Sequence, residues 1–216
     1  MCRVDTYADY DDLKRHETEG VDYLVLSRET RASVAVIAIH GGGIEPGTID
    51  IADAVAGVEY TFYGFKGIKK TGNRVLHLAS HRFDEPRGLA IVRQARVVLS
   101  IHGCREMEPV VFLGGRNREL IERIQIALNA AGFRAAIPPR PDLQGRQDRN
   151  ICNRCQSGRG VQLELSRGLR ETLFHRLSRR SRRSRTLQFD RFTATLRAVF
   201  LKRFPGRASR NGAPAA

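Results

Sequence analysis

The residues best suited to chemistry stand where an apolar run ends. The β-branched run from Val34 to Ile39 predicts a buried strand that ends at His40, and three glycines and then Glu45 follow it. Because glycine permits tight turns, the chain can bring the Glu45 carboxylate back beside the His40 imidazole. A catalytic zinc binds about three such side chains and keeps one position for water. His40 and Glu45 are therefore candidate zinc ligands, although His40 could instead only end the strand.

Two further apolar runs end in the same way. Residues 95–101 lead into His102, and residues 161–163 lead into Glu164. In open α/β sheets the ligand crevice lies at the carboxyl ends of the strands, so these side chains are expected to meet there. His102 would supply a third ligand and Glu164 a general base, which a zinc hydrolase needs besides His40 and Glu45. The alternative for Glu164 is a solvated side chain at a strand end.

The same segments resemble a known family. In chain order they are His-Gly-Gly-Gly-Ile-Glu-Pro-Gly-Thr at 40–48, residues 60–67, Phe-Asp-Glu-Pro at 83–86, Ser-Ile-His-Gly-Cys at 100–104, and residues 160–166. Together they resemble the poly-γ-glutamate hydrolases, a family of phage and bacterial proteins of which some are labelled phage-related replication proteins. The resemblance extends from about Tyr10 to Phe204.

This resemblance implies a fold and an activity. The family is similar to zinc carboxypeptidases, which implies one α/β domain with a central mixed β-sheet flanked by helices. It implies His40, Glu45 and His102 as zinc ligands, Glu164 as the general base, and cleavage of γ-glutamyl amide bonds in poly-γ-glutamate. It also favours His102 over two rival histidines. His77 lies between leucines and is expected to pack in the core, and His81 ends another predicted strand.

Several side chains are candidates for binding an anionic substrate. The irregular segment 142–160 resembles a family run that contains Asn153 and Arg154. Arginine pairs bidentately with carboxylates, so Arg154 could hold a glutamate α-carboxylate, or it could be an ordinary surface residue. Arg87 and Arg105 are candidates for stabilising the oxyanion of an amide under attack.

Composition limits the class of protein. At 216 residues with 41% apolar content, the chain is expected to form one domain, and we expect a monomer. No apolar stretch predicts a membrane span or a signal peptide, so we expect a cytoplasmic protein that reaches an extracellular substrate only after lysis or another route of release. Four cysteines do not predict a disulfide framework in such a chain, and the Cys152/Cys155 pair alone is a weak zinc motif.

The positive charge is concentrated near the C-terminus. Residues 1–164 contain 23 Lys and Arg against 21 Asp and Glu, whereas residues 165–216 contain 14 against 2. The densest run contains Arg179, Arg180, Arg182, Arg183 and Arg185. Such a run could bind a polyanion, so a nucleic-acid-binding replication protein is an alternative to the enzyme. A zinc hydrolase of another amide substrate is a further alternative.

The predicted layout follows from these patterns. We expect a catalytic domain over 1–175, an Arg/Ser-rich linker over 176–188, a helix over 189–204 that docks on the domain, and a disordered tail over 205–216. Further strands are predicted at 23–27, 59–65, 76–80 and 110–113. Helices are predicted at 49–55 with Thr48 as its N-cap, at 88–94 and at 116–131.

Overall fold

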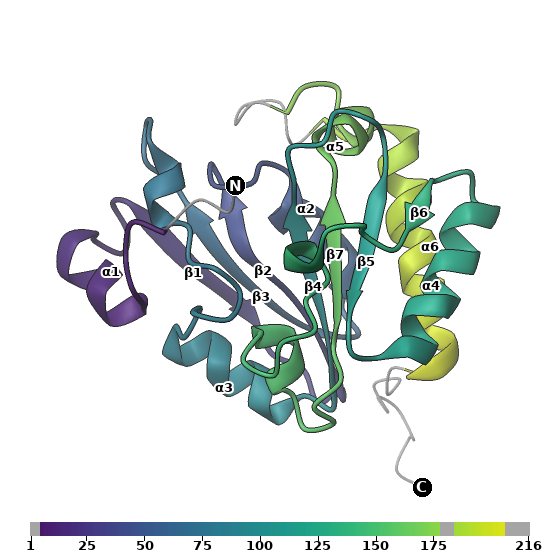
Figure 1. Ribbon diagram of the computed structural model, residues 1–216, viewed down its shortest axis with the longest axis horizontal. Helices are drawn as coiled ribbons and strands as arrows, with labels where there is room; N and C mark the ends of the chain where they lie inside the picture. Colours follow the sequence, from purple (N-terminus) through teal and green to yellow (C-terminus); the bar gives the residue numbers. More distant parts are fainter. Residues whose placement is uncertain (1–4, 178–183, 206–216) are drawn as a thin grey trace, which may run out of the picture.

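The computed structural model describes residues 5–177 and 184–205, and a seven-stranded mixed sheet forms its centre (Figure 1). The strand order is β1-β3-β2-β4-β7-β5-β6. Strands β3, β2, β4 and β7 run parallel, while β1 and β5 run antiparallel to their neighbours β3 and β7. The strands are β1 Tyr23–Arg28, β2 Val34–Gly42, β3 Thr61–Gly67, β4 Val97–Gly103, β5 Val111–Gly115, β6 Ala135–Ala136 and β7 Val161–Leu165.

Helices cover both faces of this sheet. They are α1 Tyr10–His16, α2 Thr48–Ala56, α3 Pro86–Gln94, α4 Arg118–Ala130, α5 Arg167–Leu173 and α6 Leu187–Arg203, with 3-10 turns η1 Asn73–Leu76, η2 Pro141–Leu143 and η3 Ile151–Arg154. One core joins the sheet to α2, α4, α5 and α6, and a second joins it to α1, α3 and η3. This two-sided cover explains why the central strands read as continuous apolar runs.

Strand β2 shows how one sequence serves both cores. Alternate side chains of a strand point to opposite faces. Val34, Val36 and Ala38 pack in the first core, and Ala35, Ile37 and Ile39 pack in the second. All six are fully buried, so this strand holds its place between two helical layers and fixes the position of the segment that follows it.

Three local predictions need correction. The predicted strand at 76–80 does not form; its first residue instead ends η1, and extended chain and turn follow. The N-cap of α2 is Gly47 in the left-handed region, with φ of 93°, rather than Thr48. Thr48 is the first helical residue, and its hydroxyl donates to the Glu45 carbonyl. The sequence analysis also missed α5, whose N-cap is Ser166.

Helix α6 packs beside α4 on the first core (Figure 1). Phe189, Phe192, Leu196 and Phe200 form its buried side. Arg197 adds an ion pair to Glu59 at 2.7 Å. The arginines at 179, 180, 182 and 183, as well as most of the predicted tail, lie outside the described residues. Among the described residues, no helix combines the length and the apolar character needed to cross a membrane.

We predict that Phe192→Ala destabilises the protein by about 3–5 kcal/mol, because it removes a fully buried ring and leaves a cavity. Its ring lies edge-on to Phe133 with centroids 5.1 Å apart. Leu187→Ala on the same helix is the matched control, since Leu187 is 88% exposed and should change stability by less than about 0.5 kcal/mol. Urea unfolding measures both changes; equal, small losses would contradict the docking of α6.

Candidate metal centre

The candidate zinc ligands and the candidate general base lie near the carboxyl ends of the parallel strands. His102 of β4 is the register partner of Glu164 of β7, so their side chains stand side by side on one face of the sheet. Alternation along β4 and β7 places Ser100 and Gln162 on the same face. These four polar residues are all at least nine-tenths buried. The strand ends therefore form a polar patch below the rim of the sheet.

A β-bulge turns His40 towards this patch. Strict alternation would place His40 on the face of Val36 and Ala38, opposite His102. The register with β3 shifts between Ala38 and Gly41, where β2 contains one extra residue. Bulges of this kind redirect side chains. As a result, the His40 ring lies edge-on to the His102 ring, with centroids 5.0 Å apart.

The glycine run then returns the chain to His40. Gly42 has φ of 69°, and a Cβ there would lie 2.2 Å from the Gly67 carbonyl oxygen, so a side chain is excluded. The Glu45 amide donates to the His40 carbonyl at 2.8 Å, which closes the turn. One carboxylate oxygen of Glu45 lies 3.1 Å from His40 Nδ1, and the other accepts the Gly103 amide at 2.8 Å. Glu45 thus bridges β2 and β4. Its carboxylate lies beside the His40 imidazole, as the glycine run predicted.

The nitrogen atoms of the two histidines converge. His40 Nδ1 lies 3.2 Å from His102 Nδ1. The outer nitrogens are engaged elsewhere: His40 Nε2 lies 2.7 Å from the Leu78 carbonyl oxygen, and His102 Nε2 lies 2.7 Å from Ser100 Oγ. In a tetrahedral zinc site with Zn–N near 2.1 Å, two ligand atoms lie about 3.4 Å apart. The distances from His40 Nδ1 to Glu45 and to His102 Nδ1 therefore fit zinc, whereas the group of described residues whose ligand atoms all lie within 4.8 Å of one another contains His77 in place of His102.

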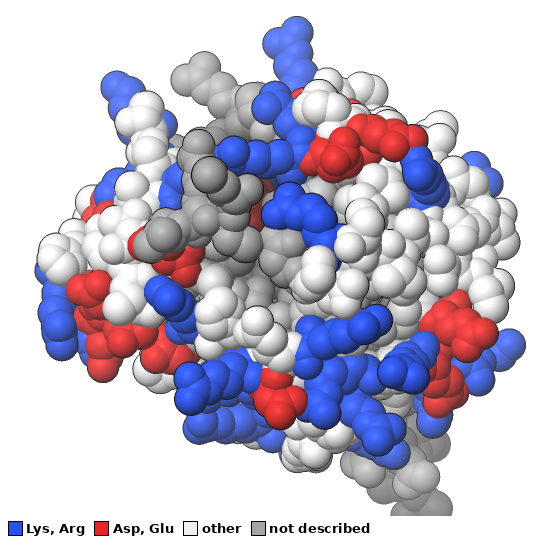
Figure 2. Space-filling model, in the orientation of Figure 1, with Lys and Arg blue, Asp and Glu red and all other residues white. Residues whose placement is uncertain are grey.

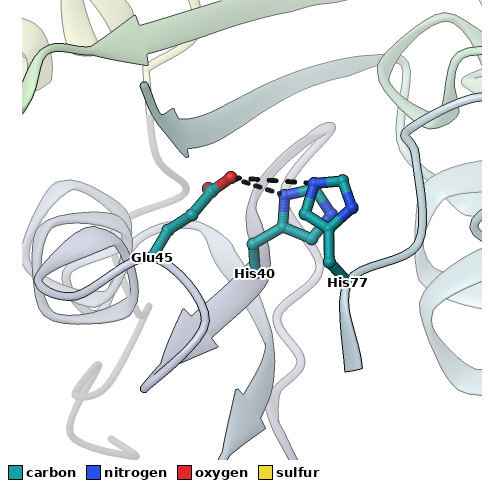
Figure 3. Close-up of side chains that lie close together, drawn as sticks. All are labelled: His40, Glu45 and His77. Carbon is teal, nitrogen blue, oxygen red and sulfur yellow. Dashed lines mark ion pairs between the residues drawn. The ribbon is translucent and has the colours of Figure 1, made fainter. Parts of the chain in front are cut away.

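His77 joins the same cluster, which the sequence analysis did not expect (Figure 3). Ligand atoms of His40, Glu45 and His77 lie within 4.8 Å of one another. The His77 ring stacks on His40 with centroids 4.0 Å apart, and its Nε2 lies 3.9 Å from a Glu45 oxygen. Its Nδ1 lies 2.8 Å from Asp5. The flanking leucines are buried as expected, but His77 itself is half-buried and faces the cluster rather than the core.

Burial and neighbouring charges shift the pKa of each residue in the cluster. Burial disfavours the charged form of His40, but the Glu45 carboxylate outweighs burial and raises its pKa. Burial also opposes ionisation of Glu45, yet His40 and His102 hold its pKa at about 2. Burial, followed by the charge of His40, lowers the pKa of His102 to about 3. The charge of His40, followed by burial, lowers the pKa of His77. Neutral imidazoles such as His102 and His77 are the metal-binding form.

A cavity of about 500 Å³ opens beside this cluster. Glu45 and His77 line it together with Cys104, whose pKa burial raises to about 11. Of the proposed substrate-binding residues, only Arg105 is in its lining. Cys104 itself is half-buried at the cavity wall.

The other three substrate-binding candidates lie elsewhere. Arg87 pairs with Glu19 and Glu85 at the start of α3. Asn153 is buried, and its amide donates to the carbonyls of Gly145 and Gln147. Arg154 stands near Arg93, Arg149 and Asp84, where burial lowers its pKa first and Arg93 second. None of the three lines the cavity.

Comparison with known proteins agrees with this arrangement. A family model described as poly-gamma-glutamate hydrolase matches residues 7–195. The UPF0714 protein YndL of Bacillus subtilis (strain 168) is 39% identical over 184 residues, which cover 82% of this chain and 70% of YndL. The chain belongs to the poly-gamma-glutamate hydrolase family. It is therefore a hydrolase, as the sequence motifs predicted.

Solved structures of the family share its fold. A bacteriophage poly-gamma-glutamate hydrolase superposes with a TM-score of 0.89 at 30% identity, covering 93% of this chain and 98% of the other. YndL in an apo, zinc-free form superposes with a TM-score of 0.87 at 36% identity, covering 91% and 98%. The predicted mixed α/β sheet of zinc carboxypeptidase type is thereby confirmed.

We predict that His102→Ala abolishes stoichiometric zinc binding, because His102 Nδ1 lies 3.2 Å from His40 Nδ1, a separation that two ligands of one zinc have. His77→Ala is the matched control and should retain zinc, since His77 Nε2 lies 3.9 Å from the Glu45 oxygen, farther than two ligands of one zinc. Metal analysis after dialysis against trace zinc measures both variants. Zinc that is lost in His77→Ala and kept in His102→Ala would assign the third ligand to His77.

Proposed function

We propose that the hydrolase is a zinc-dependent amidohydrolase that cleaves γ-glutamyl amide bonds of poly-γ-glutamate. His40, Glu45 and His102 would bind the zinc, and Glu164 would be the general base. The observation that carries the proposal is the convergence of His40 Nδ1 with a Glu45 oxygen at 3.1 Å and with His102 Nδ1 at 3.2 Å. The family to which the chain belongs supports the substrate.

Each residue has a defined task in this reaction. Zinc, when bound, supplies a Lewis acid and lowers the pKa of water towards about 7. Glu164 accepts the proton of the attacking water and passes it to the leaving amine, which is general acid–base catalysis. The register of Glu164 with His102 on the adjacent strand supports this role. The strand ends hold these groups rigidly, so little reorganisation accompanies the reaction.

The substrate class also fits the charge of the cavity. Poly-γ-glutamate carries one free α-carboxylate for every amide link, so it is a polyanion. Four arginines, at positions 74, 105, 167 and 170, line the cavity beside Glu45. A hydrolase of uncharged amides would not need this concentration of positive charge. The nucleic-acid alternative depends on arginines that lie mostly outside the described residues, and no contact in the described part favours it.

We predict that Glu164→Gln retains zinc and the fold but lowers kcat for poly-γ-glutamate by about 100-fold or more, because an amide cannot accept the proton. Glu122→Gln, an exposed change on α4, is the matched control and should leave kcat unchanged. Release of amines from defined γ-linked oligomers measures the rate.

Two outcomes would contradict the proposal. Near-normal turnover in Glu164→Gln would remove Glu164 from the base role. Cleavage of α-linked peptides without cleavage of γ-linked oligomers by the parent protein would overturn the substrate assignment.

Chelation followed by addition of zinc should abolish and then restore hydrolysis.

A further inference from the structure

Arg170, which the sequence analysis did not single out, lies under the wall of the cavity. Its side chain is buried, with 5% exposure for the residue. The guanidinium donates to three backbone carbonyls: Pro46 at 2.9 Å, Cys104 at 2.8 Å and Leu165 at 3.3 Å. The Pro46 and Cys104 carbonyls belong to the loops that follow β2 and β4, and Leu165 is the last residue of β7. Arg170 therefore ties the loops that follow β2 and β4 to the end of β7.

The positive charge of Arg170 has no ion-pair partner among residues 5–177 and 184–205. Carbonyl oxygens satisfy its donors but do not neutralise it, and buried charges are usually paired. Burial lowers the pKa of Arg170, and the nearby Glu45 carboxylate acts in the opposite direction. Guanidinium groups remain charged at neutral pH. The cavity wall thus contains a buried positive charge that forms no ion pair among the described residues, although the Glu45 carboxylate lies near enough to stabilise it.

Arg105 follows the Cys104 carbonyl that Arg170 holds. It is exposed at the cavity, and within the described ranges its side chain forms no hydrogen bond or ion pair. Arg167, by contrast, is paired with Glu171 at 2.8 Å. Figure 2 shows basic side chains beside the hollow in the upper part of this face, above the ends of the central strands in Figure 1. Arg105 is thus available for a ligand carboxylate.

We propose that Arg105 and Arg170 form a subsite for the free α-carboxylate of the glutamate unit next to the cleaved bond, with Arg105 in direct contact and Arg170 as a positioning residue. This inference depends on the proposed function. Arg105 pairs with the carboxylate, as guanidinium groups do. Arg170 fixes the backbone of the Arg105 loop and adds positive potential. A substrate without this carboxylate loses both contributions.

The test uses two γ-linked oligomers that differ only at the α-carbon group. One carries free α-carboxylates, and the other carries α-carboxamides. We expect the parent protein to prefer the acid form, and Arg105→Gln to lower kcat/KM for it by about tenfold or more, the loss expected for one charged hydrogen bond. The same variant should leave kcat/KM for the carboxamide form within about twofold. Arg118→Gln, an exposed change on α4, is the control.

Other variants and a binding measurement complete the test. Arg170→Gln keeps donors for the loops but not the charge, so it should reduce the same preference. An Arg105→Gln effect that is equal on both oligomers, or absent on both, would overturn the subsite. If the parent protein hydrolyses neither oligomer, the proposed function fails. Calorimetric binding of the two oligomers to Glu164→Gln then still decides the subsite, since equal affinities would exclude it.

A second inference concerns two buried amides behind Glu164. The Gln162 side-chain amide donates to Glu164 Oε1 at 2.9 Å. The Gln162 carbonyl oxygen accepts from Asn150 Nδ2 at 2.8 Å, and the oxygen of Asn150 accepts the Cys152 backbone amide at 3.1 Å. Since a backbone N–H can only donate, this chain of contacts fixes the orientation of both amides. The N–H group of Gln162 must therefore face Glu164.

We infer that Asn150 and Gln162 are positioning residues for Glu164. A hydrogen-bond donor on one oxygen of a carboxylate limits its rotation. The pair would therefore hold the Glu164 carboxylate in one orientation. Both residues are buried, with 5% and 2% exposure, so solvent does not replace the contact.

Asn150→Asp tests this inference with little change of shape. Aspartate still accepts the Cys152 amide, but it can no longer donate to Gln162, so the Gln162 amide turns and presents its oxygen to Glu164. We expect kcat to fall by about tenfold with KM unchanged.

Asn117→Asp is the control, since Asn117 also caps a helical segment through its oxygen and lies at the start of α4. Zinc content and circular dichroism verify the fold. Gln162→Met, which cannot donate, is the second variant and should give the same loss if Asn150→Asp does not fold. An unchanged kcat, or a rise of KM in place of a fall of kcat, in a folded, zinc-loaded variant would overturn the positioning role.

Discussion

The arrangement of the site depends on the Glu45 carboxylate. Its two oxygens contact His40 Nδ1 at 3.1 Å and the Gly103 amide at 2.8 Å, so one side chain joins the ends of two parallel strands. A buried carboxylate without such partners would be costly, because charge is poorly solvated inside a protein. Here His40 and His102 keep the Glu45 pKa at about 2 despite burial. The glycine turn brings this carboxylate back beside His40. Gly42 in that turn cannot be replaced without a clash at the Gly67 carbonyl.

Positive and negative charge are divided around this carboxylate in a way that suits an anionic polymer. Glu45 and His77 line the cavity, and His40 and His102 lie buried behind them. Arg170 and Arg105 are on its wall, and neither forms an ion pair among the described residues. An attractive field at the wall favours binding of a polyanion, while Glu45 and the histidines remain available for a metal. Net charge does not show this local arrangement, because Arg105 lies in the near-neutral residues 1–164 and Arg170 in the basic residues 165–216.

Most elements that position the site could be predicted from local sequence. The apolar runs before His40 and His102 become β2 and β4, and the run before Glu164 becomes β7. These predictions succeed because strands buried on both faces need continuous apolar runs, whatever their neighbours are. The strand predicted around His77 fails for the opposite reason. Leu76 and Leu78 are buried as predicted, but they belong to a turn and an extended segment, so burial alone did not determine the secondary structure.

The sequence by itself determined which residues could do chemistry and at which strand ends they lie, because residue type and hydrophobic pattern are local properties. It could not show that His77 stacks on His40, that Arg170 joins the loops after β2 and β4 to the end of β7, or that Asn150 and Gln162 stand in line behind Glu164. Most of those contacts join different elements of the fold, and the bulge after Ala38 turns His40 towards His102. Only the tertiary structure decides them, since they depend on strand order and register, which no local pattern encodes.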